Sequence, residues 1–455
     1  MRPTVFLFLF LFWHCLLLQA QYGKGFRSPQ KMACEETDKR HQELEMVLER
    51  VKSMQKTQPQ KQLDKSAIRF RWPLEWIFQD QDTARSFFGL SNYMDHNLSF
   101  SSIRDFNCGT RTYNTSQYNH KGTDIYLWPA WWKTMDAEEV NVVAAAKGVL
   151  VYKNDGNFDR HCAFNNSQWN VVYLLHADSL VTWYGHLKKN TVTQKQPGDT
   201  IAEGEYLGKV GSSGNSTGPH LHFEVYDSGS LVDPYAGTCN PGRPSLWKKQ
   251  HPYFNQDLIR SFCATGEPLF PPCPVSENLK EDSLFEATDS VYLTNYYRDL
   301  KNGDTTQLLL FDPSNQRIDS IFEVHNLGSD PFWDAGGWFW WFPPSYFTQS
   351  GRYQFVSRYR GEEMKASFWL GGNPVRSQKA KRYSFSISVL KEGEVLVHGV
   401  TGKEKYQVFD INHHEISSRW SFENGKVHLQ KQGLPGFFLI RIESKNGPVY
   451  LKSIW

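Results

Sequence analysis

A chain of 455 residues is too long for one ordinary hydrophobic core, so two to four domains are expected. Its formal charge of +2 is close to neutral and gives no sign of the basic footprint of a nucleic-acid-binding protein. The 16 tryptophans suit β-rich extracellular modules.

The N-terminus is predicted to be a secretory signal peptide, residues 1–20. Arg2 precedes an apolar run over residues 5–18, and Ala20 ends a small-residue cleavage pattern. Cys15 lies inside the run behind bulky residues, which disfavours lipid anchoring. No later stretch of about 20 apolar residues is present, so a second membrane span is not expected. We therefore expect a secreted or cell-surface protein.

Residues 21–95 are expected to contain a helix and a linker, or a prosegment. The apolar residues of the helix recur at helical spacing: Leu44, Val47, Leu48 and Val51. Two interpretations stay open, a plain spacer and a prosegment that covers a cleft. The aromatic-rich residues 66–95 should pack on the outside of the next domain or form one wall of its groove.

Residues 96–238 alternate apolar and polar runs with glycine turns, which is typical of antiparallel β-structure. Within them, a Gly, Ser and Thr loop leads into a short apolar run that carries His220 and His222. Side chains two residues apart on a strand point to the same face, so both imidazoles can reach one small volume. Two such histidines are often ordinary polar residues, but a zinc site needs this convergence.

Three further candidates lie upstream in glycine-marked segments. His120 and Asp124 occur in NHKGTDIYL, and His186 occurs in WYGHL. Gly122 argues against a helix interior, so a loop entering a strand is predicted for the first pair. Three ligands and an open fourth position are the pattern of a catalytic zinc site. For His176 two interpretations stay open: a packing or supporting histidine, which is at least as well favoured, and a direct role in the site.

The motifs HKGTD, WYGHL and GNSTGPHLHFEV resemble the signature blocks of the lysostaphin-type (LytM-like, β-lytic) zinc metallopeptidases. The resemblance spans residues 96–238 and implies a secreted zinc metalloendopeptidase with one Zn²⁺ per chain. Its substrates would be peptide cross-links of peptidoglycan or Gly-rich peptides. The implied metal ligands are His120, Asp124 and His222, and the implied catalytic residues are His186 and His220. The alternative is a catalytically idle cell-wall or glycan-binding protein on the same fold, which the five filled positions disfavour.

An even number of cysteines follows the signal peptide: Cys34, Cys108, Cys162, Cys239, Cys263 and Cys273. In a secreted chain this count predicts disulfides. The last three cluster after the candidate catalytic segment, where at least one bridge is expected. Zinc ligation by some of them is disfavoured, because no short C-x-x-C pair occurs among them.

A Cys- and Pro-rich connector is expected over residues 239–274, followed by a β-sandwich accessory domain over residues 275–372. Short β-branched and aromatic runs separated by turn signals indicate the sandwich. Four tryptophans form either its core or a carbohydrate platform: Trp333, Trp338, Trp340 and Trp341.

Residues 373–382 are a basic linker, and residues 383–455 form a third β unit. This unit resembles the C-terminal sorting domains of the type IX secretion system, although its Leu-Pro-Gly turn at residues 434–438 lacks one spacer residue. The resemblance implies the type IX machinery as a partner. His413 and His414 are assigned no metal. The predicted fold is mainly β: an antiparallel peptidase domain and two β-sandwich-like domains, with a short N-terminal helix.

Overall fold

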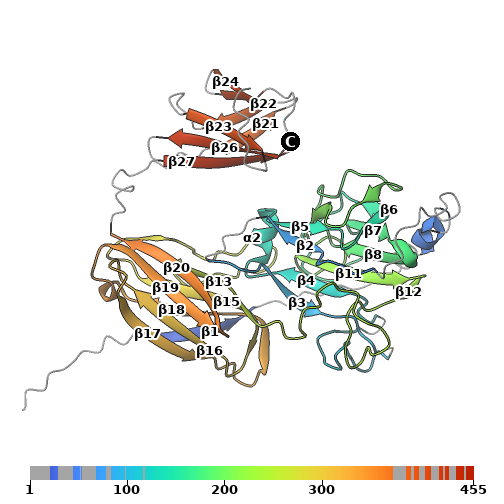
Figure 1. Ribbon diagram of the computed structural model, residues 1–455, viewed down its shortest axis with the longest axis horizontal. Helices are drawn as coiled ribbons and strands as arrows, with labels where there is room; N and C mark the ends of the chain where they lie inside the picture. The colour runs from blue at the N-terminus through green and yellow to red at the C-terminus, as the bar shows by residue number, and fades with distance from the viewer. Residues whose placement is uncertain are drawn as a thin grey trace, which may run out of the picture. The chain divides into compact units, whose positions relative to one another are not determined.

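The computed structural model describes residues 21–28, 45–51, 53, 68–77, 83–97, 99–115 and 118–371, and the strands between residues 386 and 454. The chain forms two compact units, Met1–Gly371 and Gly372–Trp455, which are considered separately (Figure 1). The described residues are mainly β, and nearly all of their strand pairs are antiparallel, as predicted. The predicted signal peptide, Cys34, the predicted linker at 373–382, His413 and His414 lie outside the described residues.

An eight-stranded antiparallel sheet forms the centre of the first unit, with the order β3-β4-β11-β8-β7-β6-β9 and β12 paired to β11. Its strands are β3 (Phe88–Asn92), β4 (Thr123–Leu127), β6 (Gly148–Asn154), β7 (Val171–Leu175), β8 (Leu180–Gly185), β9 (Thr200–Ile201), β11 (His220–Asp227) and β12 (Ser230–Leu231). The sheet begins before residue 96, because β3 pairs with β4. Strands β4 and β11 are neighbours, so the HKGTD and HLHFEV segments lie side by side.

Both faces of this sheet are covered, so nearly every residue of β7, β8 and β11 is buried. One face contributes Phe223, Val225 and Tyr184 to a large buried cluster. The opposite face contributes Trp183 and Tyr226 to a second cluster, which also contains two residues of the N-terminal segment, Val47 and Val51. Residues 45–51 are helical, in agreement with the spacing of these apolar residues.

Smaller elements complete the region around this sheet. A three-stranded sheet has the order β10-β5-β2. Its strands are β2 (Leu74–Trp76), β5 (Val140–Val143) and β10 (Tyr206–Lys209), and they accompany helix α2 (Trp131–Asp136) and the 3₁₀ turn η1 (Ala177–Ser179). Trp131, Trp132 and Met135 of α2 are buried, so the helix is held by its apolar side chains.

A β-sandwich follows, made of a four-stranded sheet β1-β18-β15-β13 and a five-stranded sheet β14-β20-β19-β16-β17 (Figure 1). Its elements are β1 (Gln21–Arg27), β13 (Asp257–Ala264), β14 (Leu284–Phe285), β15 (Val291–Lys301), β16 (Thr305–Phe311), β17 (Arg317–Val324), β18 (Phe332–Phe342), η2 (Pro344–Tyr346), β19 (Gly351–Tyr359) and β20 (Glu362–Leu370). Two of these strands come from outside the predicted sandwich segment: β1 from the N-terminal region and β13 from the predicted connector. Neither could be assigned from local pattern, because their partners are distant in sequence.

The tryptophan cluster of the sandwich is largely internal. Trp338 and Trp340 are buried in the core, while Trp333 packs against it from a partly buried position. The core interpretation therefore holds for Trp338 and Trp340, which are not available as an open carbohydrate platform.

The sandwich is joined to the eight-stranded sheet by buried polar contacts. A guanidinium nitrogen of Arg111 lies 2.9 Å from a carboxylate oxygen of Asp299, and both side chains are almost fully buried. Arg298 donates to the Ser86 hydroxyl at 2.8 Å, and the Trp128 indole donates to the carbonyl of Tyr297 at 3.0 Å. The larger apolar cluster also continues across this boundary. The eight-stranded sheet and the β-sandwich thus share one hydrophobic interior within the first unit.

Two disulfides are present in the described residues, Cys108–Cys239 and Cys162–Cys273. The cysteine-rich segment after the sheet is therefore stapled at two points. Cys263, which the even count had placed among the disulfide-forming cysteines, has no bonded partner in the described part of the chain. It lies on β13 inside the sandwich, and burial raises the pKa of its thiol well above the usual value.

The second unit consists of short antiparallel strands. They are β21 (Ser386–Leu390), β22 (Glu394–His398), β23 (Lys405–Asp410), β24 (Trp420–Glu423), β25 (Lys426–Leu429), β26 (Phe437–Ser444) and β27 (Gly447–Ile454). Strand β26 lies between β23 and β27, while β21 pairs with β22 and β24 with β25. Among the described residues of the whole chain, no helix has the length and apolar character needed to cross a membrane.

Candidate metal centre

The pairing of β4 with β11 places the first two motifs together. Asp124 and His222 are direct cross-strand partners. Residues 220 and 222 share a face of β11, as the spacing predicted. His186 is the residue after β8, the neighbour of β11 on its other side, and it has a left-handed backbone with φ of 61°. All five predicted site residues are fully buried in this small region.

The short distances in this region centre on the carboxylate of Asp124. Its Oδ1 lies 2.8 Å from Nδ1 of His222 and 3.5 Å from Nε2 of His220. Its Oδ2 lies 3.1 Å from Nε2 of His120. The ring of His186 is next to that of His220, with 4.6 Å between centroids. The structure therefore brings all five residues into one cluster.

Hydrogen bonds on the outer side of each ring determine which nitrogen faces inward. Nδ1 of His120 donates to the carbonyl of Tyr93 at 2.7 Å, so its Nε2 is the inward atom. His222 has the opposite arrangement, because its Nε2 donates to Glu224 Oε1 at 2.6 Å and its Nδ1 faces Asp124. For neutral imidazoles, these bonds leave the inward nitrogens as lone-pair donors.

The donor set suits a divalent cation. Two imidazole lone pairs and an anionic oxygen face one another, and such a concentration of electron density is unfavourable without a positive charge between them. One candidate ligand atom each from His120, Asp124 and His222 lies within 4.8 Å of the others. Mixed nitrogen and oxygen ligands of this kind are the ones that Zn²⁺ accepts. The residues present therefore fit a zinc ion.

A second grouping overlaps the first. Candidate ligand atoms of His186, His220 and His222 also lie within 4.8 Å of one another. However, Nδ1 of His186 donates to the Ser213 carbonyl at 2.6 Å, and Nδ1 of His220 donates to the Gly218 carbonyl at 2.7 Å. The Nε2 of His220 has no hydrogen-bond partner in the described residues. Geometry alone thus allows either set of three.

Gly122 of the HKGTD motif is required by the close approach of His222. A Cβ atom built at this glycine would lie 2.7 Å from Cε1 of the His222 ring and 2.7 Å from the carbonyl oxygen of Phe223. Backbone and a buried ring cannot both move aside. The glycine between His120 and Asp124 therefore makes room for the third candidate ligand.

Residues around the cluster hold its members in place. The hydroxyl of Tyr226 donates to Glu224 Oε2 at 2.6 Å, which fixes the carboxylate that binds His222. The amide of Asn92 donates to Asp124 Oδ2 at 3.0 Å. Supporting contacts of this kind orient metal ligands and tune their basicity.

These supporting residues were not among the site residues predicted from the sequence. Glu224 and Tyr226 could have been found, because they continue the alternation of His220 and His222 along one strand face. Asn92 could not, because its position depends on the pairing of β3 with β4, which the sequence does not reveal.

His176 does not belong to the cluster. Its Nδ1 donates to the carbonyl of Lys147 at 2.9 Å, and its Nε2 lies 2.7 Å from the hydroxyl of Thr182. Thr182 faces the side of the sheet opposite to Trp183, which pairs with Glu224. Burial lowers the pKa of His176 to about 4, so the ring is neutral near pH 7. This is the packing role that the sequence suggested.

Comparison with known proteins bears on the same region. Residues 118–234, which contain all five site residues, match peptidase family M23. This segment is an M23 domain. The family expected from the motifs is therefore confirmed for this part of the chain.

Three named bacterial proteins illustrate what this chain is similar to. DD-carboxypeptidase/endopeptidase Mpg of Neisseria meningitidis is 36% identical over 93 residues, covering 20% of this chain and 19% of the relative. Peptidoglycan DD-endopeptidase ShyC of Vibrio cholerae is 33% identical over 115 residues, covering 25% and 22%. Cell division protein DipM of Caulobacter vibrioides is 41% identical over 71 residues, covering 14% and 11%. The chain spans about a fifth of the length of the first two relatives and less of the third.

The support of His222 by Glu224 leads to a prediction. Glu224→Ala should weaken zinc binding by roughly 10–100-fold, because the Nε2–H of His222 loses its acceptor and the ring is no longer held. Tyr226→Phe should change affinity in the same direction and by less. Competition with a chromogenic chelator measures both. An unchanged zinc affinity in Glu224→Ala would show that the carboxylate does not support a ligand.

Proposed function

We propose that this chain is a secreted zinc metalloendopeptidase that hydrolyses peptide bonds in peptidoglycan cross-links. The observation that carries the proposal is the convergence of His120, Asp124 and His222 beside two further buried histidines. The M23 match and the DD-endopeptidase names of its relatives support the reaction class and the substrate.

In this proposal His120, Asp124 and His222 hold one zinc ion. Bound zinc supplies a polarised scissile carbonyl and a water whose pKa is lowered toward about 7. His186 and His220 supply proton transfer at Nε2, because the Nδ1 of each ring is committed to a backbone carbonyl. A neutral Nε2 accepts the proton of the attacking water. A protonated Nε2 stabilises the oxyanion or gives its proton to the leaving amine.

The test is digestion of purified peptidoglycans with different cross-bridges, together with Gly-rich peptides, by the zinc-loaded chain. Mass spectrometry then identifies new amino termini. We expect new termini within the cross-links, and none after chelation or in Asp124→Ala. Binding to peptidoglycan without new termini would favour the catalytically idle alternative and overturn the proposal.

We further propose that the second unit is a sorting domain that directs export through the type IX machinery. The support is its resemblance in sequence and its paired short strands after the linker. A chain that ends at Lys379 should still hydrolyse substrate in vitro but should remain inside the producing cell. Normal export of the truncated chain from its native host would contradict the sorting role.

A further inference from the structure

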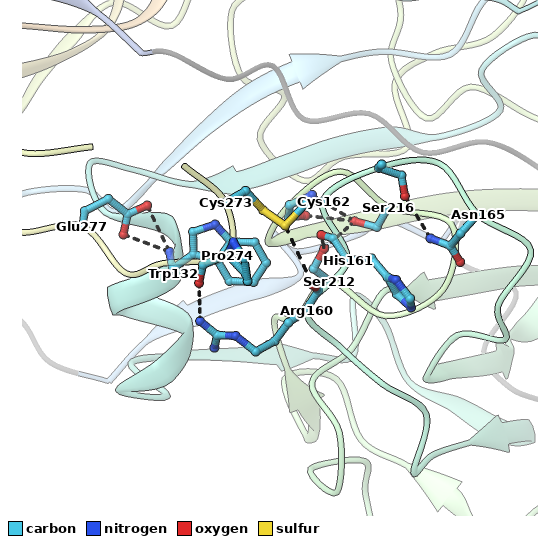
Figure 2. Close-up of a disulfide and its surroundings, with 12 residues drawn as sticks. Trp132, Arg160, His161, Cys162, Asn165, Ser212, Ser216, Cys273, Pro274 and Glu277 are labelled. Carbon is cyan, nitrogen blue, oxygen red and sulfur yellow. Dashed lines mark hydrogen bonds between the residues drawn. A yellow bond between two sulfur atoms is a disulfide. The ribbon is translucent and has the colours of Figure 1, made fainter. Parts of the chain in front are cut away.

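A loop that the proposed mechanism does not use lies along the catalytic histidines. We call residues 155–168, between β6 and β7, the strap, and residues 211–219, which precede β11, the His loop. The strap carries Cys162, whose disulfide to Cys273 anchors it to the segment that follows β13 (Figure 2).

Isolated β-bridges pair the strap with the His loop. Arg160 forms a bridge with Ser212, and Ala163 forms one with Ser216. The amide of Ser212 donates to the carbonyl of Asp159 at 3.1 Å, and the Ser212 hydroxyl donates to the carbonyl of His161 at 2.8 Å. The two bridges, at Arg160 and at Ala163, lie on either side of Cys162.

Asn165 makes the next contacts along the strap. Its side-chain amide donates to the carbonyl of Gly214 at 2.8 Å, and its backbone N–H donates to Oδ1 of Asn215 at 2.7 Å. Gly214 has φ of 71°, and a Cβ atom there would lie 2.6 Å from Cβ of Trp169. The His loop is therefore confined between the strap and the buried tryptophan.

The His loop, in turn, supplies the acceptors that orient both catalytic histidines. The carbonyl of Ser213 accepts from Nδ1 of His186, and the carbonyl of Gly218 accepts from Nδ1 of His220. Ser216, which pairs with the strap, donates its hydroxyl to the same Gly218 carbonyl at 3.0 Å. Hydrogen bonds of residues next to Cys162, together with the backbone of the His loop, thus connect the strap to the acceptors of both imidazoles.

The anchor of the strap is itself fixed. Arg160 donates to the carbonyl of Pro274 at 2.6 Å, and its guanidinium lies 4.8 Å from the centroid of the Trp132 ring (Figure 2). Glu277 accepts from the backbone amides of Trp132 and Lys133 in α2. The disulfide therefore links the strap to a segment that is itself hydrogen-bonded to the backbone of helix α2.

We infer that Cys162–Cys273 is a positioning element for His186 and His220: it holds the His loop so that both rings keep their proton on Nδ1 and present Nε2. This inference rests on the proposed function. It predicts that breaking the bridge reduces turnover while the proposed zinc ligands, which lie on β4, on β11 and in the segment just before β4, keep their metal.

The chain contains a matched control. Cys108–Cys239 closes a chain segment of 131 residues and Cys162–Cys273 one of 111, so the entropic stabilisation by the two bridges should be nearly equal. The Cys239 amide of the first bridge donates to the carbonyl of Phe106, which belongs neither to the strap nor to the His loop. A purely structural role would give both bridges the same effect on activity.

The experiment compares Cys162→Ser/Cys273→Ser with Cys108→Ser/Cys239→Ser in the full zinc-loaded chain, at a temperature where each is folded. We expect the first to keep about one zinc and lose roughly 10–100-fold in kcat with a smaller change in KM, because small misplacements of catalytic groups are costly. The control should stay within about threefold of wild type. Equal losses in the two variants, or an unchanged kcat in the first, would overturn the inference.

Nitrogen NMR of the imidazoles provides a readout independent of hydrolysis. Wild type and control should show His186 and His220 protonated at Nδ1, and the first variant should show mixed tautomers. If wild type hydrolyses nothing, the proposed function fails and the tautomers still decide the positioning role. If the first variant does not fold, Asn165→Ala takes its place. We expect it to keep its zinc, lose kcat and show mixed tautomers of His186 and His220. Unchanged tautomers would contradict the inference.

Discussion

His220→Ala should reduce hydrolysis of a peptidoglycan-derived peptide by roughly 10²–10⁴-fold and leave zinc bound. The ring is fully buried, and its Nδ1 donates to the Gly218 carbonyl. Its Nε2 faces the cluster and lies 3.5 Å from Oδ1 of Asp124. Removing it deletes a proton-transfer group without deleting one of the three proposed ligands. Steady-state kinetics and zinc content, measured on the same sample, test the loss of hydrolysis and the retention of zinc.

His186→Ala should behave in the same way, and His176→Gln serves as the matched control. His176 is equally buried but faces the other side of the sheet, so its replacement should leave both turnover and zinc content close to wild type. The assignment fails if His186→Ala or His220→Ala loses its zinc while His120→Ala retains it, because His222 belongs to both candidate ligand sets. That result would favour the three-histidine set.

The second large effect concerns stability. Asp299→Asn should lower the free energy of unfolding of the first unit by about 3–5 kcal/mol, because it leaves the Arg111 guanidinium buried without its counter-charge. Arg111 also donates to the carbonyl of Leu90 at 2.5 Å, on the strand beside β4. The loss should therefore reach the eight-stranded sheet as well as the sandwich.

An exposed ion pair on the same sandwich provides the comparison. Nε of Arg358 lies 2.6 Å from Oε1 of Glu363, and about half of each side chain is exposed. Glu363→Ala should therefore lower the free energy of unfolding by at most about 1 kcal/mol. Denaturant unfolding followed by fluorescence measures both variants. If Asp299→Asn costs no more than Glu363→Ala, the sandwich and the sheet do not depend on this buried pair.

The candidate site was largely predictable from sequence because its residues lie in short local patterns. His220 and His222 follow the strand period, and His120 and Asp124 lie on either side of a glycine. These patterns give side-chain direction, but they do not give the partner strands. The meeting of Asp124 with His222 is a consequence of pairing between segments about 98 residues apart.

The unpredicted parts of the fold share one cause, which is long-range pairing. Strand β1 pairs with β18 more than 300 residues later, with Phe26 opposite Gly337. Strand β13 lies in the segment that was predicted to be a connector, yet its residue Cys263 lies in the sandwich core. The N-terminal helix was predicted from its own spacing, but its position against Tyr226, on the strand face that also carries His222, was not. Whether it acts as a prosegment remains a prediction.

X-ray absorption at the zinc edge of the loaded chain tests the central claim most directly. We expect four light-atom neighbours at about 2.0–2.2 Å, from two imidazoles, one carboxylate oxygen and one water oxygen. Asp124→Ala should abolish this signal, and His220→Ala should leave its two-imidazole pattern unchanged. A spectrum of three imidazoles that survives in Asp124→Ala and disappears in His220→Ala would contradict the account.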